Sequence, residues 1–241
     1  MRLVHLPVAL TLCALSTLSC RSRSSADNPS VAALEPTTAA VTTPTAASAS
    51  STAATAAAPV RAELGSPAPD FTLPDLDGKA VSLAAFRGKT IVLEWFNPEC
   101  PFVRASHSKG SLRGAAVRHQ KAGVVWLAIN SAAPGKQGSS RDENVQARER
   151  FELQHPILRD ESGKIGKLYG AERTPHLFVI DARGVLVYRG AIDNSPDGEG
   201  ESPTSDKLVR YVDVALSELA QGKAVTVADT PAYGCSVKYG T

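Results

Sequence analysis

The pattern of hydrophobic positions divides the chain into three parts. An apolar stretch over 8–15 follows Arg2 and ends shortly before Cys20, which is the layout of a secretory signal and is too short to span a bilayer. Ala, Ser, Thr and Pro supply 31 of the 40 residues over 21–60, so this segment lacks the apolar side chains that would offset the entropy of ordering it. We therefore predict a signal peptide over 1–20, a disordered tether over 21–62 and one folded domain over 63–241.

Within the domain, short apolar runs with strand-like character alternate with segments of helical spacing. β-branched and aromatic runs between turn residues predict strands over 71–73, 80–83, 90–96, 124–130, 156–158, 177–181 and 185–190. Amphipathic spacing predicts helices over 101–121, with breaks at Gly110 and Gly114, and over 142–153, 163–169 and 206–220. This order predicts an α/β fold in which an N-terminal β-hairpin precedes a mixed central β-sheet with helices on both faces.

Charge and loop chemistry exclude two classes of partner. The chain has 26 Lys plus Arg against 24 Asp plus Glu and contains no block of five basic residues, so we expect no nucleic-acid binding. The triplet Gly88-Lys89-Thr90 is not a phosphate-binding loop, because that motif needs a glycine five positions before Gly88, where Leu83 stands.

Cys100 is the strongest candidate for chemistry, because it lies between a central strand and a helix that begins at Pro101. The free N–H groups and partial positive charge of a helix N-terminus stabilise a thiolate, which is the nucleophilic form of cysteine. Glu99 would oppose that charge, and Arg104 or Arg173 would offset Glu99. The alternative is a buried and inert cysteine.

The four histidines of the domain are weaker candidates. His107 lies two helical turns after Cys100, and His176 directly follows Pro175 in the segment 174–181, from where it could approach the thiol. We expect His119 and His155 on the solvated surface.

Three segments resemble the redoxin branch of the thioredoxin superfamily, which holds the alkyl hydroperoxide reductase and thiol-specific antioxidant (AhpC/TSA) proteins. They are GSPAPDF over 65–71, Trp95-Phe96 before Cys100, and TPHLFVID over 174–181. The resemblance implies a thioredoxin-like fold and a thiol oxidoreductase, which the predicted signal peptide would direct to export. Its Cys100 would reduce disulfides or peroxides with electrons from an external thiol, and without a cofactor or metal.

Around Cys100 the sequence departs from the thioredoxin-type motif and from the peroxiredoxin-type motif of that superfamily. Val103 stands where thioredoxin-like reductases carry a second cysteine, so a local disulfide is excluded. Leu93 and Asn97 stand where typical peroxiredoxins carry Pro and Thr. Peroxide and protein disulfide therefore both remain open as substrates.

The resemblance also implies roles for residues far from Cys100. Thr174-Pro175 resembles the cis-proline loop that faces the reactive thiol, and implies a substrate-binding edge at the Thr174 backbone. Peroxiredoxins commonly use a distant resolving cysteine, and Cys235 is the candidate, in a segment after the last helix that we expect to fold back. Cys235 has three open roles: redox partner of Cys100, half of a permanent disulfide, or free thiol. A redox-inert binding module with a groove around Pro175 is the alternative function.

Cys20 stands where bacterial lipoproteins carry their acylated cysteine, and the tether follows it directly. The preceding residues 15–19 match a lipobox only in part. Lipid anchoring of the exported chain to a membrane at Cys20 and ordinary signal-peptidase cleavage are both open.

Overall fold

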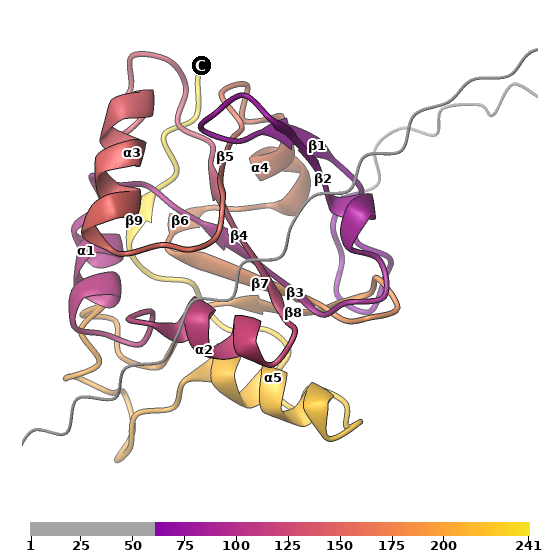
Figure 1. The fold of residues 1–241 in the computed structure, drawn as a ribbon. Helices are drawn as coiled ribbons and strands as arrows, with labels where there is room; N and C mark the ends of the chain where they lie inside the picture. Colours follow the sequence, from indigo (N-terminus) through magenta and orange to yellow (C-terminus); the bar gives the residue numbers. More distant parts are fainter. Residues whose placement is uncertain (1–60) are drawn as a thin grey trace, which may run out of the picture. The chain divides into compact units, whose positions relative to one another are not determined.

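A central five-stranded sheet organises the domain (Figure 1). The computed structural model describes residues 61–241, so the predicted signal peptide, Cys20 and nearly all of the tether lie outside the described residues. The strands run in the order β5 (Ile157–Arg159), β4 (Val125–Asn130), β3 (Ile91–Trp95), β7 (His176–Ile180) and β8 (Leu186–Gly190). β4 is parallel to β3 and β5, whereas β7 is antiparallel to β3 and β8, which confirms the predicted mixed sheet.

The middle strand β3 is buried along its whole length, because both of its faces are covered. Leu93 and Trp95 point to one side and Val92 to the other, where Glu94 also lies. A continuous apolar run suits a strand that is covered on both faces.

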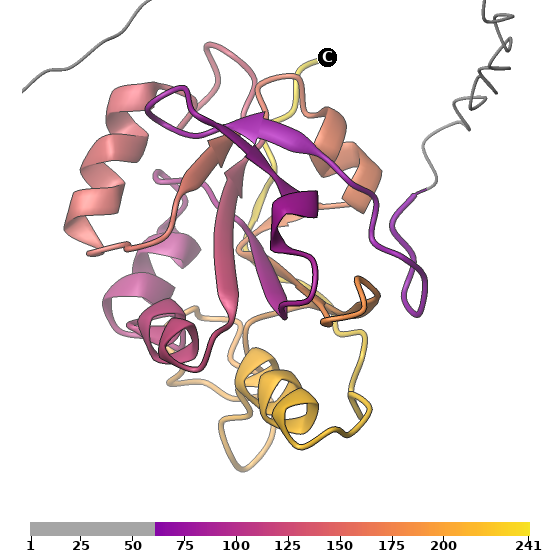
Figure 2. The same cartoon turned by 45° about the vertical axis from the view of Figure 1, so that its right-hand side comes forward.

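One face of the sheet is covered by the N-terminal hairpin and one helix. The hairpin consists of β1 (Thr72–Pro74) and β2 (Ala80–Ser82), followed by the 3-10 helix η1 (Leu83–Phe86), and the helix is α4 (Lys164–Tyr169). Figure 2 shows the purple hairpin and the orange α4 on the same side of the sheet.

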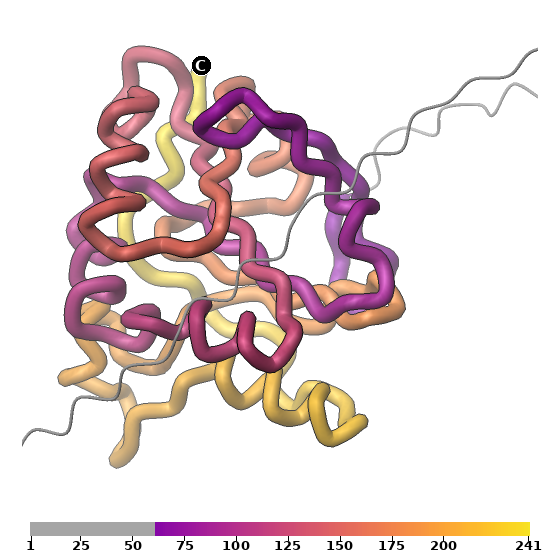
Figure 3. The backbone as a smooth tube through the Cα atoms, viewed as in Figure 1, coloured from indigo at the N-terminus to yellow at the C-terminus, as the bar shows by residue number. Residues whose placement is uncertain are grey.

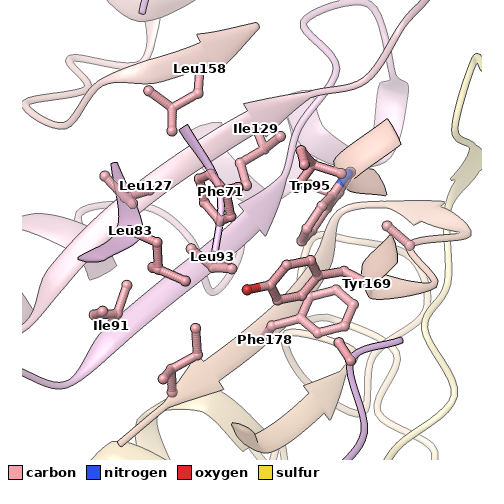
Figure 4. Close-up of a cluster of buried hydrophobic side chains, with 14 of the residues drawn as sticks. Phe71, Leu83, Ile91, Leu93, Trp95, Leu127, Ile129, Leu158, Tyr169 and Phe178 are labelled. Carbon is pink, nitrogen blue, oxygen red and sulfur yellow. The ribbon is translucent and has the colours of Figure 1, made fainter. Parts of the chain in front are cut away.

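Three aromatic rings form the centre of that core (Figure 4). The ring centroid of Trp95 lies 4.9 Å from that of Phe178 and 5.5 Å from that of Tyr169. Such rings bury about 150–250 Å² each, and edge-to-face contacts add to the stabilisation from burial. These contacts fix the end of β3 that leads into Cys100.

The opposite face is covered by the other four helices, which are α1 (Pro101–Ser108), α2 (Ala115–Lys121), α3 (Arg141–Arg150) and α5 (Tyr211–Ala220). The predicted arrangement with helices on both faces is therefore confirmed. None of the helices within residues 61–241 is long and apolar enough to cross a membrane.

Two helix boundaries have clear local causes. The break between α1 and α2 includes Gly110, where a Cβ would lie 2.1 Å from the carbonyl oxygen of Gly198. α5 begins five residues later than predicted, because the side chain of Asn194 accepts from Val209 N at 2.8 Å and donates to Lys207 O at 3.0 Å. These bonds hold the preceding residues outside the helix.

At the N-terminal end the domain begins earlier than the sequence predicts, and at the C-terminal end the tail folds back as expected but also forms a strand pairing that was not predicted. Ala62, which the sequence assigns to the tether, is buried and donates its N–H to Leu168 O at 3.0 Å. The tail, residues 228–240, returns across the molecule as the yellow end of the tube in Figure 3. It contains β9 (Cys235–Ser236), which pairs antiparallel with β6 (Arg173–Thr174) in a two-stranded sheet that the sequence pattern did not predict.

Candidate functional site

Cys100 lies at the end of a turn that the buried side chain of Asn97 holds in place. Asn97 Oδ1 accepts from Glu99 N at 2.9 Å, and Asn97 Nδ2 donates to Gln137 O at 2.9 Å. The Cys100 N–H donates to Asn97 O at 3.1 Å. Cys100 is the N-cap residue of α1 and Pro101 takes the first helical position, so the thiol stands at the helix N-terminus where the sequence places it.

The thiol of Cys100 contacts the loop that the sequence marks as a substrate-binding edge. Its Sγ donates to the carbonyl oxygen of Thr174 at 3.0 Å, although 74 residues separate the two in sequence. The Thr174–Pro175 peptide bond is cis, as expected. Only 2% of the surface of Cys100 is exposed. The thiol of Cys100 therefore lies beneath other parts of the chain.

Cys235 reaches the same place from the tail. In the pairing of β6 with β9, Cys235 lies opposite Thr174. Cys100 and Cys235 are both free thiols, and Cys235 packs against the buried cluster that includes Cys100. Burial, first, and then the neighbouring Cys100 sulfur raise the pKa of Cys235 to about 11. The structure thus brings together Cys100, Thr174 and Cys235, and leaves the two cysteines unlinked.

The charged side chains next to the thiol pair with each other. Arg104 Nη2 lies 2.5 Å from Glu99 Oε1, and Arg104 Nε donates to Pro98 O at 2.9 Å. Of the two arginines that the sequence offers as partners of Glu99, the structure selects Arg104. Arg173 lies in β6 with its side chain exposed.

Two of the histidine expectations are wrong. His155 is only 2% exposed, and His119 is half-buried with its Nε2 at 2.6 Å from Asp213 Oδ1. His176 is buried as well, and its Nδ1 accepts from Glu172 N at 3.3 Å. Burial and the nearby Arg189 charge lower the pKa of His176 to about 4. His176 is therefore neutral near pH 7.

The sequence analysis missed a buried carboxylate in the middle of the sheet. Glu94 is fully buried; its Oε1 lies 2.7 Å from His107 Nε2, and its Oε2 accepts from Trp126 Nε1 at 3.0 Å. Burial raises the pKa of the Glu94 carboxyl, but the charge and hydrogen bond of His107, with smaller contributions from His155 and Trp126, outweigh it and lower the pKa overall. A single acidic residue inside an apolar strand was the available signal.

A cavity of about 450 Å³ lies over this cluster and is lined by Glu94, His107, Trp126, Phe151 and His155 among others. Neither ring nitrogen of His155 has a hydrogen-bond partner. Within residues 61–241 no group of three or more His, Cys, Asp or Glu side chains is arranged to hold a metal ion.

A thiol at the end of a central strand, on a helix N-terminus and facing a cis-proline loop is the arrangement that the resemblance implied. The model of the Redoxin family matches residues 63–208. The chain belongs to the Redoxin family. The matched region of this redoxin includes Cys100, Thr174 and Pro175 and ends before α5 and the tail, so Cys235 lies beyond it.

Similar proteins come from both activity types of the superfamily. Thiol-disulfide oxidoreductase ResA of Geobacillus thermodenitrificans (strain NG80-2) is 35% identical over 123 residues, which cover 50% of this chain and 65% of that protein. Peroxiredoxin Q, chloroplastic, of Oryza sativa subsp. japonica is 29% identical over 131 residues, which cover 52% of this chain and 57% of that protein. The similarity thus spans less than two thirds of the length of either relative.

Two solved structures match over a larger share of the redoxin. A hypothetical protein of Sinorhizobium meliloti 1021 superimposes with a TM-score of 0.65 at 28% identity, covering 74% of this chain and 96% of that chain. An uncharacterized conserved protein of Geobacillus kaustophilus has a TM-score of 0.65 at 29% identity and is covered to 93%. The thioredoxin-like fold expected from the sequence is therefore shared well beyond the segment around Cys100.

Proposed function

We propose that this redoxin is a thiol oxidoreductase in which Cys100 attacks the oxidising substrate and Cys235 resolves the product. The observation that carries the proposal is the meeting of the Cys100 and Cys235 thiols beside the Thr174 carbonyl. Cys235 packs against the buried cluster that contains Cys100, and a disulfide between them requires a Cα separation of about 4.4–6.8 Å.

The helix N-terminus supplies the electrostatic part of the proposal. The thiolate of Cys100 is the attacking species, and the N–H groups of the first turn of α1 favour negative charge at the N-cap position. Arg104 pairs with Glu99 and so reduces the repulsion between that carboxylate and a thiolate.

With a peroxide, the Cys100 thiolate attacks one oxygen, so an S–O bond forms and the O–O bond breaks. The leaving alkoxide or hydroxide takes a proton and becomes an alcohol or water. The sulfur is oxidised to a sulfenic acid. The Cys235 sulfur then attacks Cys100, an S–S bond forms and water leaves. Two external thiols reduce this disulfide and are themselves oxidised to a disulfide.

With a disulfide substrate, the Cys100 thiolate attacks one sulfur and releases the other as a thiol. Cys235 attacks Cys100 in the resulting mixed disulfide and releases the second substrate thiol. The substrate gains two electrons and two protons, and the protein ends in the same Cys100–Cys235 disulfide. Both names among the relatives, peroxiredoxin Q and thiol-disulfide oxidoreductase ResA, support a cycle of this type.

Intact mass after oxidation tests the proposal. One equivalent of hydrogen peroxide should make the reduced protein lighter by two hydrogens, and Cys100→Ser should abolish the reaction, because a serine hydroxyl does not ionise at neutral pH. Cys235→Ser should instead accumulate a sulfenic acid that dimedone traps. Ser236→Ala, at the exposed neighbouring position, is the control and should behave as wild type.

Turnover in Cys100→Ser would refute the role of Cys100. If Cys235→Ser turns over at the wild-type rate without a trapped sulfenic acid, Cys235 does not resolve the intermediate. A protein with no fast-reacting thiol at all would support the redox-inert binding module.

We further propose that the chain acts outside the cytoplasm, with the segment before Cys20 as its signal and the retained Cys20 as its lipid anchor. The apolar run over 8–15 and the Ala-, Ser-, Thr- and Pro-rich segment behind Cys20 support this proposal. Labelled palmitate should enter the wild-type chain and not Cys20→Ala in cells that express them. Unlabelled wild type, found free in the medium or periplasm, would contradict the anchor.

A further inference from the structure

The tail occupies the backbone edge that an extended peptide would need. A peptide that adds to an exposed strand pairs through its own backbone N–H and C=O groups. In this structure β9 already pairs with β6, placing Ser236 opposite Arg173 and Cys235 opposite Thr174. The next residue continues the pairing, because Val237 N donates to Glu172 O at 3.0 Å. Figure 1 shows the yellow β9 beside β6.

Contacts on both sides of β9 hold the tail against the domain. Before β9, the Tyr233 hydroxyl donates to Asp193 Oδ1 at 2.8 Å. After β9, the carbonyl of Lys238 accepts from Ala133 N at 2.9 Å, and the Tyr239 hydroxyl donates to Ala171 O at 2.7 Å. The tail is thus fastened at both ends of the segment that covers the site.

Gly234 brings the tail into direct contact with the Thr174 carbonyl. A Cβ built on Gly234 would lie 2.2 Å from that oxygen, and the residue has a φ of +108°. The same oxygen accepts the hydrogen bond from Cys100 Sγ. The thiol and the tail therefore converge on one backbone atom, and no room is left for a third chain there.

We propose that the docked tail is a built-in competitor for this edge, which admits small hydroperoxides to Cys100 and excludes peptide and protein disulfides. The proposal rests on the proposed function and adds the substrate class to it. The 2% exposure of Cys100 supports it, because a protein disulfide must bring its sulfur and the backbone around it to the thiol. A peroxide needs to bring only two oxygen atoms.

The peroxide reaction forms the S–O bond at Cys100, breaks the O–O bond and releases an alcohol or water. Cys235 is then already at the site when the sulfenic acid forms. The peptide is excluded by a clash with the tail, and excluding a competitor by a clash is an established source of specificity.

Gly234→Ala tests the proposal with a matched control. The added Cβ must displace the tail from Thr174, whereas Gly222→Ala adds a Cβ at a similar positive φ of +71° with no atom within 4 Å. The reduced full chain is mixed with hydrogen peroxide or with insulin as the disulfide probe. The oxidation of Cys100 is then followed by intact mass, as sulfenic acid, intramolecular disulfide or mixed disulfide.

Wild type and Gly222→Ala should react with hydrogen peroxide faster than with insulin disulfides by about 100-fold or more, because the tail excludes the peptide. Gly234→Ala should raise the insulin rate by about tenfold or more, while the first oxidation of Cys100 by peroxide remains within about threefold of wild type. An insulin rate in wild type close to the peroxide rate would overturn the proposal. So would an unchanged insulin rate in Gly234→Ala.

Tyr239→Ala provides a second route to the same result. It removes the hydrogen bond to Ala171 O and the ring that packs against Gly163 and Gly166, without changing the residues beside Thr174. Tyr239→Ala should also raise the rate at which Cys100 reacts with insulin disulfides. The proposal would be refuted if the tail of Tyr239→Ala became sensitive to protease while this rate stayed unchanged. Failure of the proposed function looks different, because Cys100 would then react with neither probe in any variant.

Discussion

The buried Glu94–His107 pair leads to a stability prediction for Glu94→Gln. Removing one partner of a buried ion pair leaves the other without its partner and typically costs about 3–5 kcal/mol. The glutamine side chain has a similar shape and keeps one oxygen as an acceptor for Trp126 Nε1, so we expect the lower end, about 3 kcal/mol. For a domain of this size that loss lowers the midpoint temperature by about 6–12 °C.

The control for this prediction is Glu149→Gln, which makes the same chemical change at an exposed position of α3. Surface substitutions of this kind usually change stability by less than about 0.5 kcal/mol. Urea unfolding of both variants and of wild type at pH 7, followed by tryptophan fluorescence, measures the difference, and the slope with urea should stay the same. A loss below about 1 kcal/mol in Glu94→Gln would refute a charged, paired Glu94.

The pH dependence gives the same prediction a second test. The pKa of Glu94 is lowered in the folded protein, so its ionised form contributes stability that is fully present above the ordinary glutamate pKa. That contribution is lost as the pH falls through the folded-state pKa. The stability difference between wild type and Glu94→Gln should therefore be constant near neutral pH and shrink below about pH 4.3.

Two further predictions concern His155 and the turn before Cys100. Burial lowers the pKa of His155 to about 4, so between about pH 6.5 and 4 the unfolded chain binds a proton that the folded chain does not. The free energy of unfolding therefore falls in this range by up to about 1.4 kcal/mol per pH unit as the pH is lowered. His155→Phe should flatten this slope and stabilise the protein by about 1 kcal/mol, and an unchanged slope in acid unfolding would refute the reasoning. Gly138→Ala places a Cβ 2.1 Å from Asn97 Oδ1 and should slow the peroxide reaction of Cys100 by about tenfold. Gly135→Ala is the control, because Gly135 also has a positive φ but no atom lies within 4 Å of the added Cβ. Equal rates in the two variants would mean that Asn97 does not position the thiol.

The elements that the sequence predicted share one property, which is that their signal is local. β3 is a short apolar run between turn residues, and the hairpin of β7 and β8 turns at Asp181, whose Oδ1 accepts from Arg183 N and Val185 N at 3.0 Å. Cys100 was identified for the same reason, because a strand followed by a cysteine and then Pro101 can be read from adjacent residues. Local patterning sets such elements whatever the rest of the chain does.

The features that the sequence did not predict depend on contacts between distant segments. β9 has only two residues and exists because β6 lies opposite it, so no periodicity marks it. His155 lies between Gln154 and Pro156, as is typical of a surface-loop residue, yet its ring lies over the buried cluster of Glu94 and Trp126. The late start of α5 depends on Asn194, which lies twelve residues before the predicted helix begins. Tertiary contacts outweighed local propensity at each of these places.

The pairing of Thr174 with Cys235 also determines when the site can form during synthesis. Translation makes Cys100 first, Thr174 74 residues later and Cys235 a further 61 residues later. At about 5–20 residues per second, Cys100 is in the chain for several seconds before Thr174 and Cys235 have both been added. The central strands β3, β4 and β7 are complete by then. A newly made chain therefore contains Cys100 before the residues that cover it have been added, and the tail is the last part of the site to be synthesised.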